Sequence, residues 1–246
     1  MHSLKTKNMN TIKATILLAL SVLLFSCGGK SQKKTPIDTL IRDMEGEKTF
    51  EIMLFDMEEG GIFSDYKHQY IIIRERDSVV INDSTQVAET VKIPYKKKTT
   101  WYVITKEFYK KNLDNMGMTL VSKDENGKIS KIPAPAGYNR YVGNRSYGHW
   151  NGGFWQFYGQ YMFMSSMFHM MSPISYGGYN NYRSNYSGRR PYYGSTSGGK
   201  TQYGTRSSSS QSRIKSGSSR YSSGRRTSSG SRYGGSSRSS GGSYGK

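Results

Sequence analysis

The sequence has a single cysteine, Cys27, among its 246 residues. One thiol cannot close an intramolecular disulfide, and a thiolate zinc site needs several cysteines. The cysteine content therefore excludes a disulfide-stabilised scaffold and a cysteine-ligated zinc centre.

Acidic residues are absent from the second half of the chain. All 17 lie at or before Glu125, whereas residues 126–246 carry 17 of the 36 lysines and arginines. The net charge of +19 therefore belongs almost entirely to the second half. This asymmetry favours a folded part followed by a basic segment that meets anionic partners.

Long aliphatic runs are also scarce. The run from Ala14 to Phe25 is uncharged but only 12 residues long, too short to span a bilayer comfortably. Three lysines precede it, so residues 1–26 have the charge and length pattern of an export signal.

The run ends in Leu24-Phe25-Ser26-Cys27, which resembles the lipobox of bacterial lipoproteins. In that family the cysteine receives a diacylglycerol thioether, and the signal is cut before it. The resemblance implies lipidation at Cys27 and a membrane-anchored lipoprotein on the periplasmic or extracellular face of the envelope. Residues 27–34 would be a short polar tether, and two or more acyl chains would hold the protein stably.

Residues 35–135 predict a small α+β domain, with a mixed sheet and two helices. Apolar residues at helical spacing favour a helix from Pro36 to Met44, and Thr105 is a plausible N-cap of a second helix ending near Met116. Strands are expected over 49–57, 70–76 with an extension at 79–81, and 100–105. A hairpin is expected over 118–132, turning at Asn126-Gly127.

No catalytic constellation is recognisable in this domain, and the sequence predicts neither an enzyme nor a cofactor. We expect His68 to be a solvent-facing strand residue and Glu58-Glu59 a solvated turn. Lys96-Lys97-Lys98 is expected in an exposed loop, whose functional interpretation is contact with anionic headgroups.

Residues 136–176 are rich in aromatic residues and methionine. The favoured interpretation is a helix in the membrane interface or packed against the domain. A membrane-spanning helix over 154–172 is a second interpretation. A soft-metal site is a third, because thioethers and an imidazole suit Cu(I). Its candidate ligands are Met162, Met164, Met167, His169, Met170 and Met171.

Residues 177–246 consist mainly of Ser, Gly, Tyr and Arg, with Ile214 as the only aliphatic side chain. This composition predicts a disordered basic tail. Its guanidinium groups are candidate anion-binding groups, and a spacer without any partner is the alternative. The arginines concerned are Arg183, Arg189, Arg190, Arg220, Arg225, Arg226, Arg232 and Arg238.

The overall plan is loosely similar to that of small, poorly characterised envelope lipoproteins with an α+β domain and a Gly/Ser/Arg-rich tail. That resemblance implies a location and no reaction. The sequence therefore predicts a structural or interaction role, with the tail binding anionic lipids or envelope polymers. Copper handling through the methionine cluster and extracellular nucleic-acid binding through the tail are the alternatives.

Overall fold

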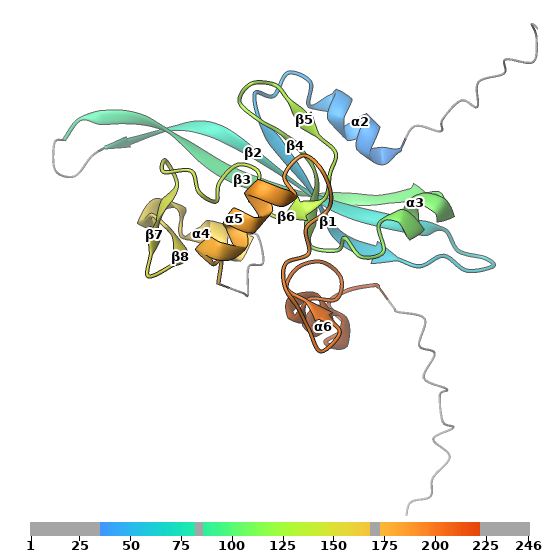
Figure 1. Ribbon diagram of the computed structural model, residues 1–246. Coiled ribbons are helices and arrows are strands. Elements are labelled where there is room, and N and C mark those ends of the chain that lie inside the picture. The colour runs from blue at the N-terminus through green and yellow to red at the C-terminus, as the bar shows by residue number, and fades with distance from the viewer. Residues whose placement is uncertain (1–34, 82–85, 168–172, 222–246) are drawn as a thin grey trace, which may run out of the picture. The chain divides into compact units, whose positions relative to one another are not determined.

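A computed structural model of the chain describes residues 35–81, 86–167 and 173–221 (Figure 1). Strands and helices both contribute, which confirms the predicted α+β class. The predicted signal peptide, Cys27 and the tether lie outside the described residues.

An antiparallel sheet organises the fold (Figure 1). Its main strands are β1 (Phe50–Glu58), β2 (Tyr66–Ile81), β3 (Ala88–Ile104) and β4 (Met118–Lys123). They lie in the order β3-β2-β1-β4, which continues to β5 (Ile129–Ser130), while β6 (Ala134–Pro135) also pairs with β4. β1 is central and largely buried on both faces, so apolar side chains lie on both sides of it, and the carboxylates of Glu51 and Asp56 are buried among them.

The predicted hairpin at Asn126-Gly127 is confirmed as the β4–β5 connection. The Asp124 carboxylate accepts hydrogen bonds from the backbone N–H groups of Asn126 and Lys128. Gly127 has a positive φ of 79°, which glycine adopts without strain.

β2 and β3 form a hairpin that runs beyond the rest of the sheet. β1 pairs with β2 only from Lys67 to Arg74, whereas β2 and β3 stay paired out to Ile81 and Ala88. The loop expected at Lys96–Lys98 is therefore wrong, because these residues pair with Ile73, Ile72 and Ile71 inside β3. Pro94 is tolerated within the strand because β3 is the edge of the sheet.

Two helices contribute to the core on one face of the sheet. α2 (Pro36–Asp43) buries Ile37 and Leu40 in the cluster that contains Phe50 and Leu54 of β1. In α3 (Lys106–Lys111), Thr105 is the N-cap as predicted, its hydroxyl accepting from the backbone N–H of Phe108. The prediction placed the end of this helix near Met116, but α3 already ends at Lys111, five residues earlier.

The opposite face of the sheet is covered by the described residues of 136–176, which we call the aromatic segment. After Pro135 the chain forms the hairpin β7 (Gly148–Asn151) and β8 (Phe154–Phe157), the 3-10 turn η1 (Gly159–Tyr161) and the short helix α4 (Phe163–Met167). The expected single helix over this region is wrong, although its packing against the domain is found. No helix among the described residues is long and apolar enough to cross a membrane.

The predicted boundary at residue 135 does not separate two units of structure. Tyr138, Tyr141 and Tyr147 are buried in one cluster with Met53 and Ile73 of the sheet. The aromatic segment therefore completes the core of the domain that precedes it.

The predicted tail is ordered through residue 221, so the expectation of disorder from residue 177 is wrong for residues 177–221. They form α5 (Tyr176–Asn185), the short strands β9 (Thr196–Ser197) and β10 (Lys200–Thr201), and α6 (Ser208–Lys215). Residues 222–246 lie outside the described residues.

Tyrosine explains why this segment folds. Tyr179, Tyr182 and Tyr192 are 9%, 2% and 4% exposed, and their rings pack around Tyr138 at centroid distances of 5.6, 5.4 and 6.4 Å. A buried tyrosine removes roughly 150–250 Å² from water. Several such rings replace the aliphatic side chains that the composition lacks.

Hydrogen bonds of Thr205 and a close backbone approach at Gly204 hold this part of the segment in place. The Thr205 hydroxyl donates to the Leu113 carbonyl and accepts from the Met116 N–H. At Gly204 a Cβ would lie 2.3 Å from the Asp114 carbonyl oxygen, so only glycine permits this approach. Residues 204–205 therefore dock on the loop after α3.

Candidate functional site

One network of largely buried charged side chains is centred on Arg140 and Glu75. The side chains of Arg140 and Glu75 are each 5% exposed, and a guanidinium nitrogen lies 2.9 Å from a carboxylate oxygen. Glu75 also accepts hydrogen bonds from the hydroxyls of Tyr147 and Thr49. These groups satisfy one another in a largely buried setting, so we assign them to stability.

Glu51 of β1 lies near this network. It is completely buried, and one carboxyl oxygen accepts from the Thr119 hydroxyl and the Gly137 N–H. Burial raises the pKa of Glu51, although the charge of Arg140 and these two hydrogen bonds act against the increase. The carboxyl group serves to join β1, β4 and the aromatic segment.

Several surface carboxylates are also engaged in ion pairs. Glu47 pairs with Arg74 at 2.6 Å, Asp38 with Lys131 at 3.0 Å, and Asp114 with Arg206 at 3.5 Å. Glu58 contacts Lys67 and Arg220 at 3.6 and 2.9 Å. These pairs leave a large share of the positive charge uncompensated.

The exposed lysines of β3 form what we call the basic edge. It comprises Lys92, Lys96, Lys97 and Lys98, all exposed on the edge strand of the sheet. Within the described ranges, none of the four takes part in an ion pair. Lys96 and Lys98 share a face of the strand and are separated by about 7 Å along it. The sequence therefore places exposed ammonium groups without ion pairs along the edge strand, although Lys92 lies opposite Asp77 of β2 and the Lys98 ammonium lies 5.2 Å from the Phe55 ring centroid.

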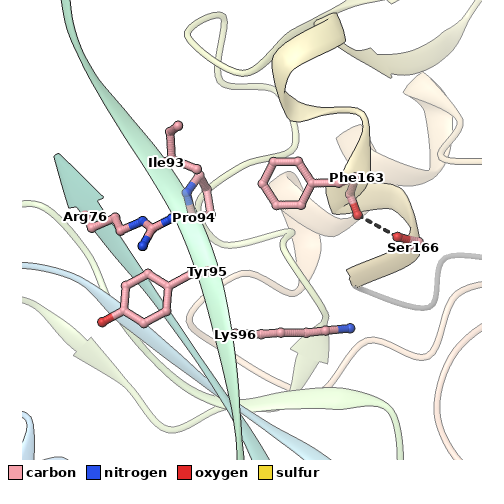
Figure 2. Close-up of a pocket in the computed structure, with 7 residues that line it drawn as sticks. All are labelled: Arg76, Ile93, Pro94, Tyr95, Lys96, Phe163 and Ser166. Carbon is pink, nitrogen blue, oxygen red and sulfur yellow. Dashed lines mark hydrogen bonds between the residues drawn. The ribbon is translucent and has the colours of Figure 1, made fainter. Parts of the chain in front are cut away.

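An open groove lies between this edge and α4 (Figure 2). Its volume is about 360 Å³. Ile93, Pro94 and Tyr95 of β3 and Phe163 and Ser166 of α4 form much of its lining. The cations Arg76 and Lys96 complete it, and no carboxylate belongs to the described lining. We call this the edge groove.

Arg76 of the edge groove packs on the Tyr95 ring, as does Arg74 outside the groove. The guanidinium groups of Arg74 and Arg76 lie 5.2 and 5.9 Å from the centroid of the Tyr95 ring. Figure 2 shows the Lys96 side chain on the same side of β3 as Phe163 and Ser166. The groove thus joins apolar walls to positive charge.

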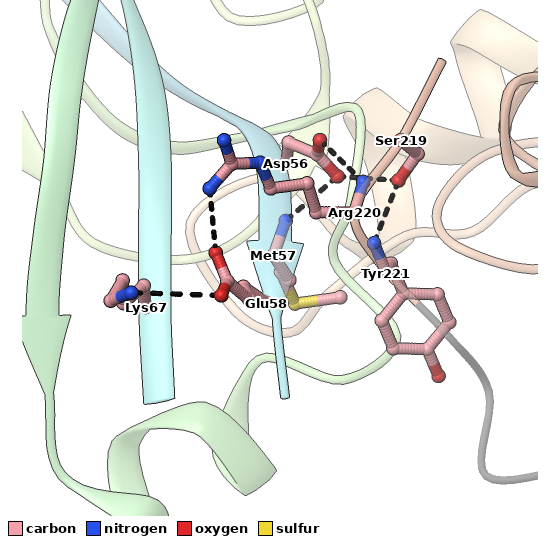
Figure 3. Close-up of polar contacts among 7 residues, drawn as sticks. All are labelled: Asp56, Met57, Glu58, Lys67, Ser219, Arg220 and Tyr221. Atoms are coloured by element: carbon pink, nitrogen blue, oxygen red, sulfur yellow. Dashed lines mark hydrogen bonds and ion pairs between the residues drawn. The ribbon is translucent and has the colours of Figure 1, made fainter. Parts of the chain in front are cut away.

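A second polar cluster holds the end of the described chain against β1 (Figure 3). The buried Asp56 carboxylate accepts from the Ser219 hydroxyl, from the Arg220 N–H at 3.0 Å and from the Met57 N–H at 2.9 Å. The Arg220 guanidinium pairs with Glu58 and lies 4.9 Å from the Trp101 ring centroid. We call Ser219 to Tyr221 the C-terminal latch.

The latch gives a first prediction. Asp56→Ala removes the acceptor of three donors and should lower the free energy of unfolding by about 1–3 kcal/mol. It should also speed trypsin cleavage after Arg213, Lys215 and Arg220 under native conditions, as followed by mass spectrometry. Asp65→Ala, at an exposed acidic residue, is the control and should leave the cleavage rates unchanged. Unchanged cleavage in Asp56→Ala would contradict the latch.

The arginines predicted to bind anions differ in their exposure and contacts in the structure. Arg220 is engaged in the latch. Arg183, Arg189 and Arg190 are exposed at the end of α5 and just beyond it, with Arg190 stacked 4.3 Å from the Tyr186 ring centroid. Arg225, Arg226, Arg232 and Arg238 lie outside the described residues.

The methionines predicted as copper ligands are only partly described. Met164 is buried in the aromatic core, whereas Met162 is 66% exposed. The side chain of Met167 and residues His169, Met170 and Met171 are not described. The structure therefore does not bring the two described thioethers into one environment.

His68 is a correction to the sequence prediction. It is fully buried rather than solvent-facing, and its ring packs 5.6 and 5.8 Å from the rings of Phe108 and Tyr109. Its Nδ1 lies 3.1 Å from the Tyr70 hydroxyl. Burial lowers the pKa of His68 to about 3, so the imidazole is neutral over the physiological range.

Sequence reasoning missed the edge groove. Lys96–Lys98 were recognised as exposed cations, but Arg76 lies 20 residues before Lys96 and Phe163 lies 67 residues after it. No local spacing could have joined them. Comparison of the chain with protein-family models, with curated proteins and with solved structures found no significant match.

Proposed function

We propose that the protein is a membrane-anchored envelope lipoprotein that binds anionic envelope components through its basic surface. The observation that carries the proposal is the basic edge, four exposed lysines with no ion-pair partner among the described residues. Cations on an edge strand also discourage pairing with other sheets. The adjoining groove, which contains no described carboxylate, favours a binding role in addition.

The anchoring part of the proposal rests on the lipobox pattern that ends at Cys27. A protein held by two or more acyl chains stays at the membrane surface. Anionic lipid headgroups and acidic envelope polymers are then the partners within reach. Arg183, Arg189 and Arg190 extend the positive surface of the described chain.

Binding is tested with the mature chain lacking the lipid. We expect it to cosediment with an acidic polysaccharide and not with a neutral polysaccharide of the same length at 0.1 M salt, where charge screening extends over about 10 Å. Equal recovery with both polymers, or with neither, would contradict the proposal.

Anchoring gives a second prediction. Cys27→Ser should abolish incorporation of labelled lipid and block signal cleavage at this site, because the thioether cannot form. Ser26→Ala, which keeps a small residue before the cysteine, is the control and should be labelled as the wild type is. Equal labelling of Cys27→Ser and wild type would exclude lipidation at this residue.

A further inference from the structure

The edge groove differs from the rest of the basic surface because it offers apolar walls beside its cations. Phe163 is 40% exposed, although its neighbour Met164 is fully buried. Pro94 and Ile93 lie opposite its ring in Figure 2. A site for small free anions would need only the charges, so the apolar walls indicate a ligand with a ring or an aliphatic body.

The polar groups of the groove indicate what such a ligand carries. Lys96 and Arg76 provide positive charge, and no described carboxylate lines the groove to repel an anion. The Ser166 hydroxyl donates its hydrogen to the Phe163 carbonyl at 2.8 Å. Its oxygen lone pairs therefore remain as acceptors for a ligand hydroxyl.

We propose that the edge groove binds an acidic sugar residue of a polysaccharide, such as a hexuronate. This inference rests on the proposed function and names the ligand class of its central surface. The C–H groups of the pyranose would face the negative π surface of Phe163. The carboxylate would meet Lys96, while Arg76, on the other side of β3 in Figure 2, would add to the positive potential.

The volume and the open shape of the groove agree with a single polysaccharide strand that passes along it, and not with a deep pocket for a free sugar. A volume of about 360 Å³ lies at the small end of the range for ligand sites, about 300–1,000 Å³. The groove is open, so a polymer can pass through it without a chain end. Beyond the groove, Lys98 continues the positive charge on the face of β3 that carries Lys96.

The test measures binding of the full mature chain to an oligogalacturonate, to the matching neutral galactose oligomer and to tripolyphosphate by isothermal titration calorimetry. We expect the oligogalacturonate to bind at least tenfold more tightly than either of the other two. Lys96→Gln and Phe163→Ala should each weaken that binding at least tenfold.

Two control variants match these substitutions elsewhere on the surface. Lys128→Gln removes the same charge at the β4–β5 turn, and Phe154→Ala removes a ring of similar exposure on β8. Both should change the affinity less than twofold. Because Lys96 is exposed, we expect Lys96→Gln to weaken binding without disturbing the fold. Thermal unfolding of each variant checks that the fold is intact.

Two results would overturn the inference. Equal losses in Lys96→Gln and Lys128→Gln would mean that only net charge matters, and tripolyphosphate binding as tightly as oligogalacturonate would mean that the ring is not recognised. In either case the wild type still binds acidic polymers, so the proposed function survives. Failure of the wild type to bind any acidic polymer contradicts both.

Discussion

Arg140→Met is expected to lower the free energy of unfolding by about 3–5 kcal/mol, because it leaves a buried carboxylate without its counter-charge. Both side chains of the Arg140–Glu75 pair are 5% exposed, and the guanidinium also donates to the Tyr141 hydroxyl at 3.0 Å. In the variant, Glu75 would keep only the hydroxyls of Tyr147 and Thr49. Urea denaturation at pH 7 measures the loss.

A double variant separates the charge from the packing. Arg140→Met/Glu75→Gln removes both charges and keeps an amide oxygen for the two hydroxyl donors. We expect it to recover most of the stability that Arg140→Met loses, since replacing both members of a buried pair costs far less than removing one. Arg42→Met, at an arginine whose side chain is 61% exposed, is the matched control and should cost less than 1 kcal/mol. A similarly small loss in Arg140→Met would contradict the assigned role.

Acid is expected to destabilise the protein through His68. The pKa of His68 is about 3 in the folded chain because the ring is buried, and about 6.5 when the chain is unfolded. As the pH falls below 6.5, His68 binds a proton in the unfolded state but stays neutral in the folded state. Stability therefore falls with decreasing pH from about 6.5 to about 3, by roughly 1.6 kcal/mol between pH 6.5 and pH 5.

The His68 contribution is measured by comparing the pH dependence of stability in the wild type and in His68→Gln. Glutamine does not titrate and still offers an acceptor near the Tyr70 hydroxyl, which lies 3.1 Å from the imidazole. The variant should show a shallower fall between pH 6.5 and pH 4. His149→Gln, at an exposed histidine, is the control and should keep the wild-type slope. Parallel profiles for wild type and His68→Gln would contradict the burial of His68.

Local patterns in the sequence predicted the elements that depend on local chemistry. The apolar face of α2, the cap at Thr105 and the Asn126-Gly127 hairpin are found as expected. Each is determined by residues within a few positions of one another, through helical spacing, side-chain capping or a turn that needs a positive φ.

The remaining features depend on contacts between distant segments. A Ser/Gly/Tyr/Arg composition predicted disorder, but Tyr179, Tyr182 and Tyr192 find a platform at Tyr138 that lies 41 or more residues earlier. The burial of His68 likewise depends on α3, which brings Phe108 and Tyr109 over it. A composition rule that weighs only aliphatic residues underestimates what tyrosine can bury.

Dependence on distant contacts also explains why the sequence indicated the lysines of the candidate site but not its groove. The lysine run of β3 marks a basic surface without any structure, but its register against β2 determines which lysines share a face. The edge groove exists only because the aromatic segment folds back onto the sheet and places α4 beside β3. The favoured interpretation was a helix in the membrane interface or packed against the domain, and the first of these arrangements would have left no such groove.

The central claim is that the basic edge binds anionic polymers, and the salt dependence of that binding tests it most directly. The measurement compares the wild type with a variant in which Lys92, Lys96, Lys97 and Lys98 are changed to glutamine. A matched control changes Lys106, Lys110, Lys111 and Lys128, which are also exposed but lie outside the basic edge, in α3 and at the β4–β5 turn. Each binds an acidic polysaccharide at several salt concentrations.

Because each cation that contacts the polymer releases counterions, the slope of log affinity against log salt counts the contacts, at roughly 0.7–0.9 per charge for nucleic acids. We predict that the basic-edge variant loses at least tenfold in affinity and about two or more units of slope, whereas the control variant stays within threefold of the wild type. Equal loss of affinity and slope in the two variants would contradict the claim, because binding would then follow net charge and not the basic edge.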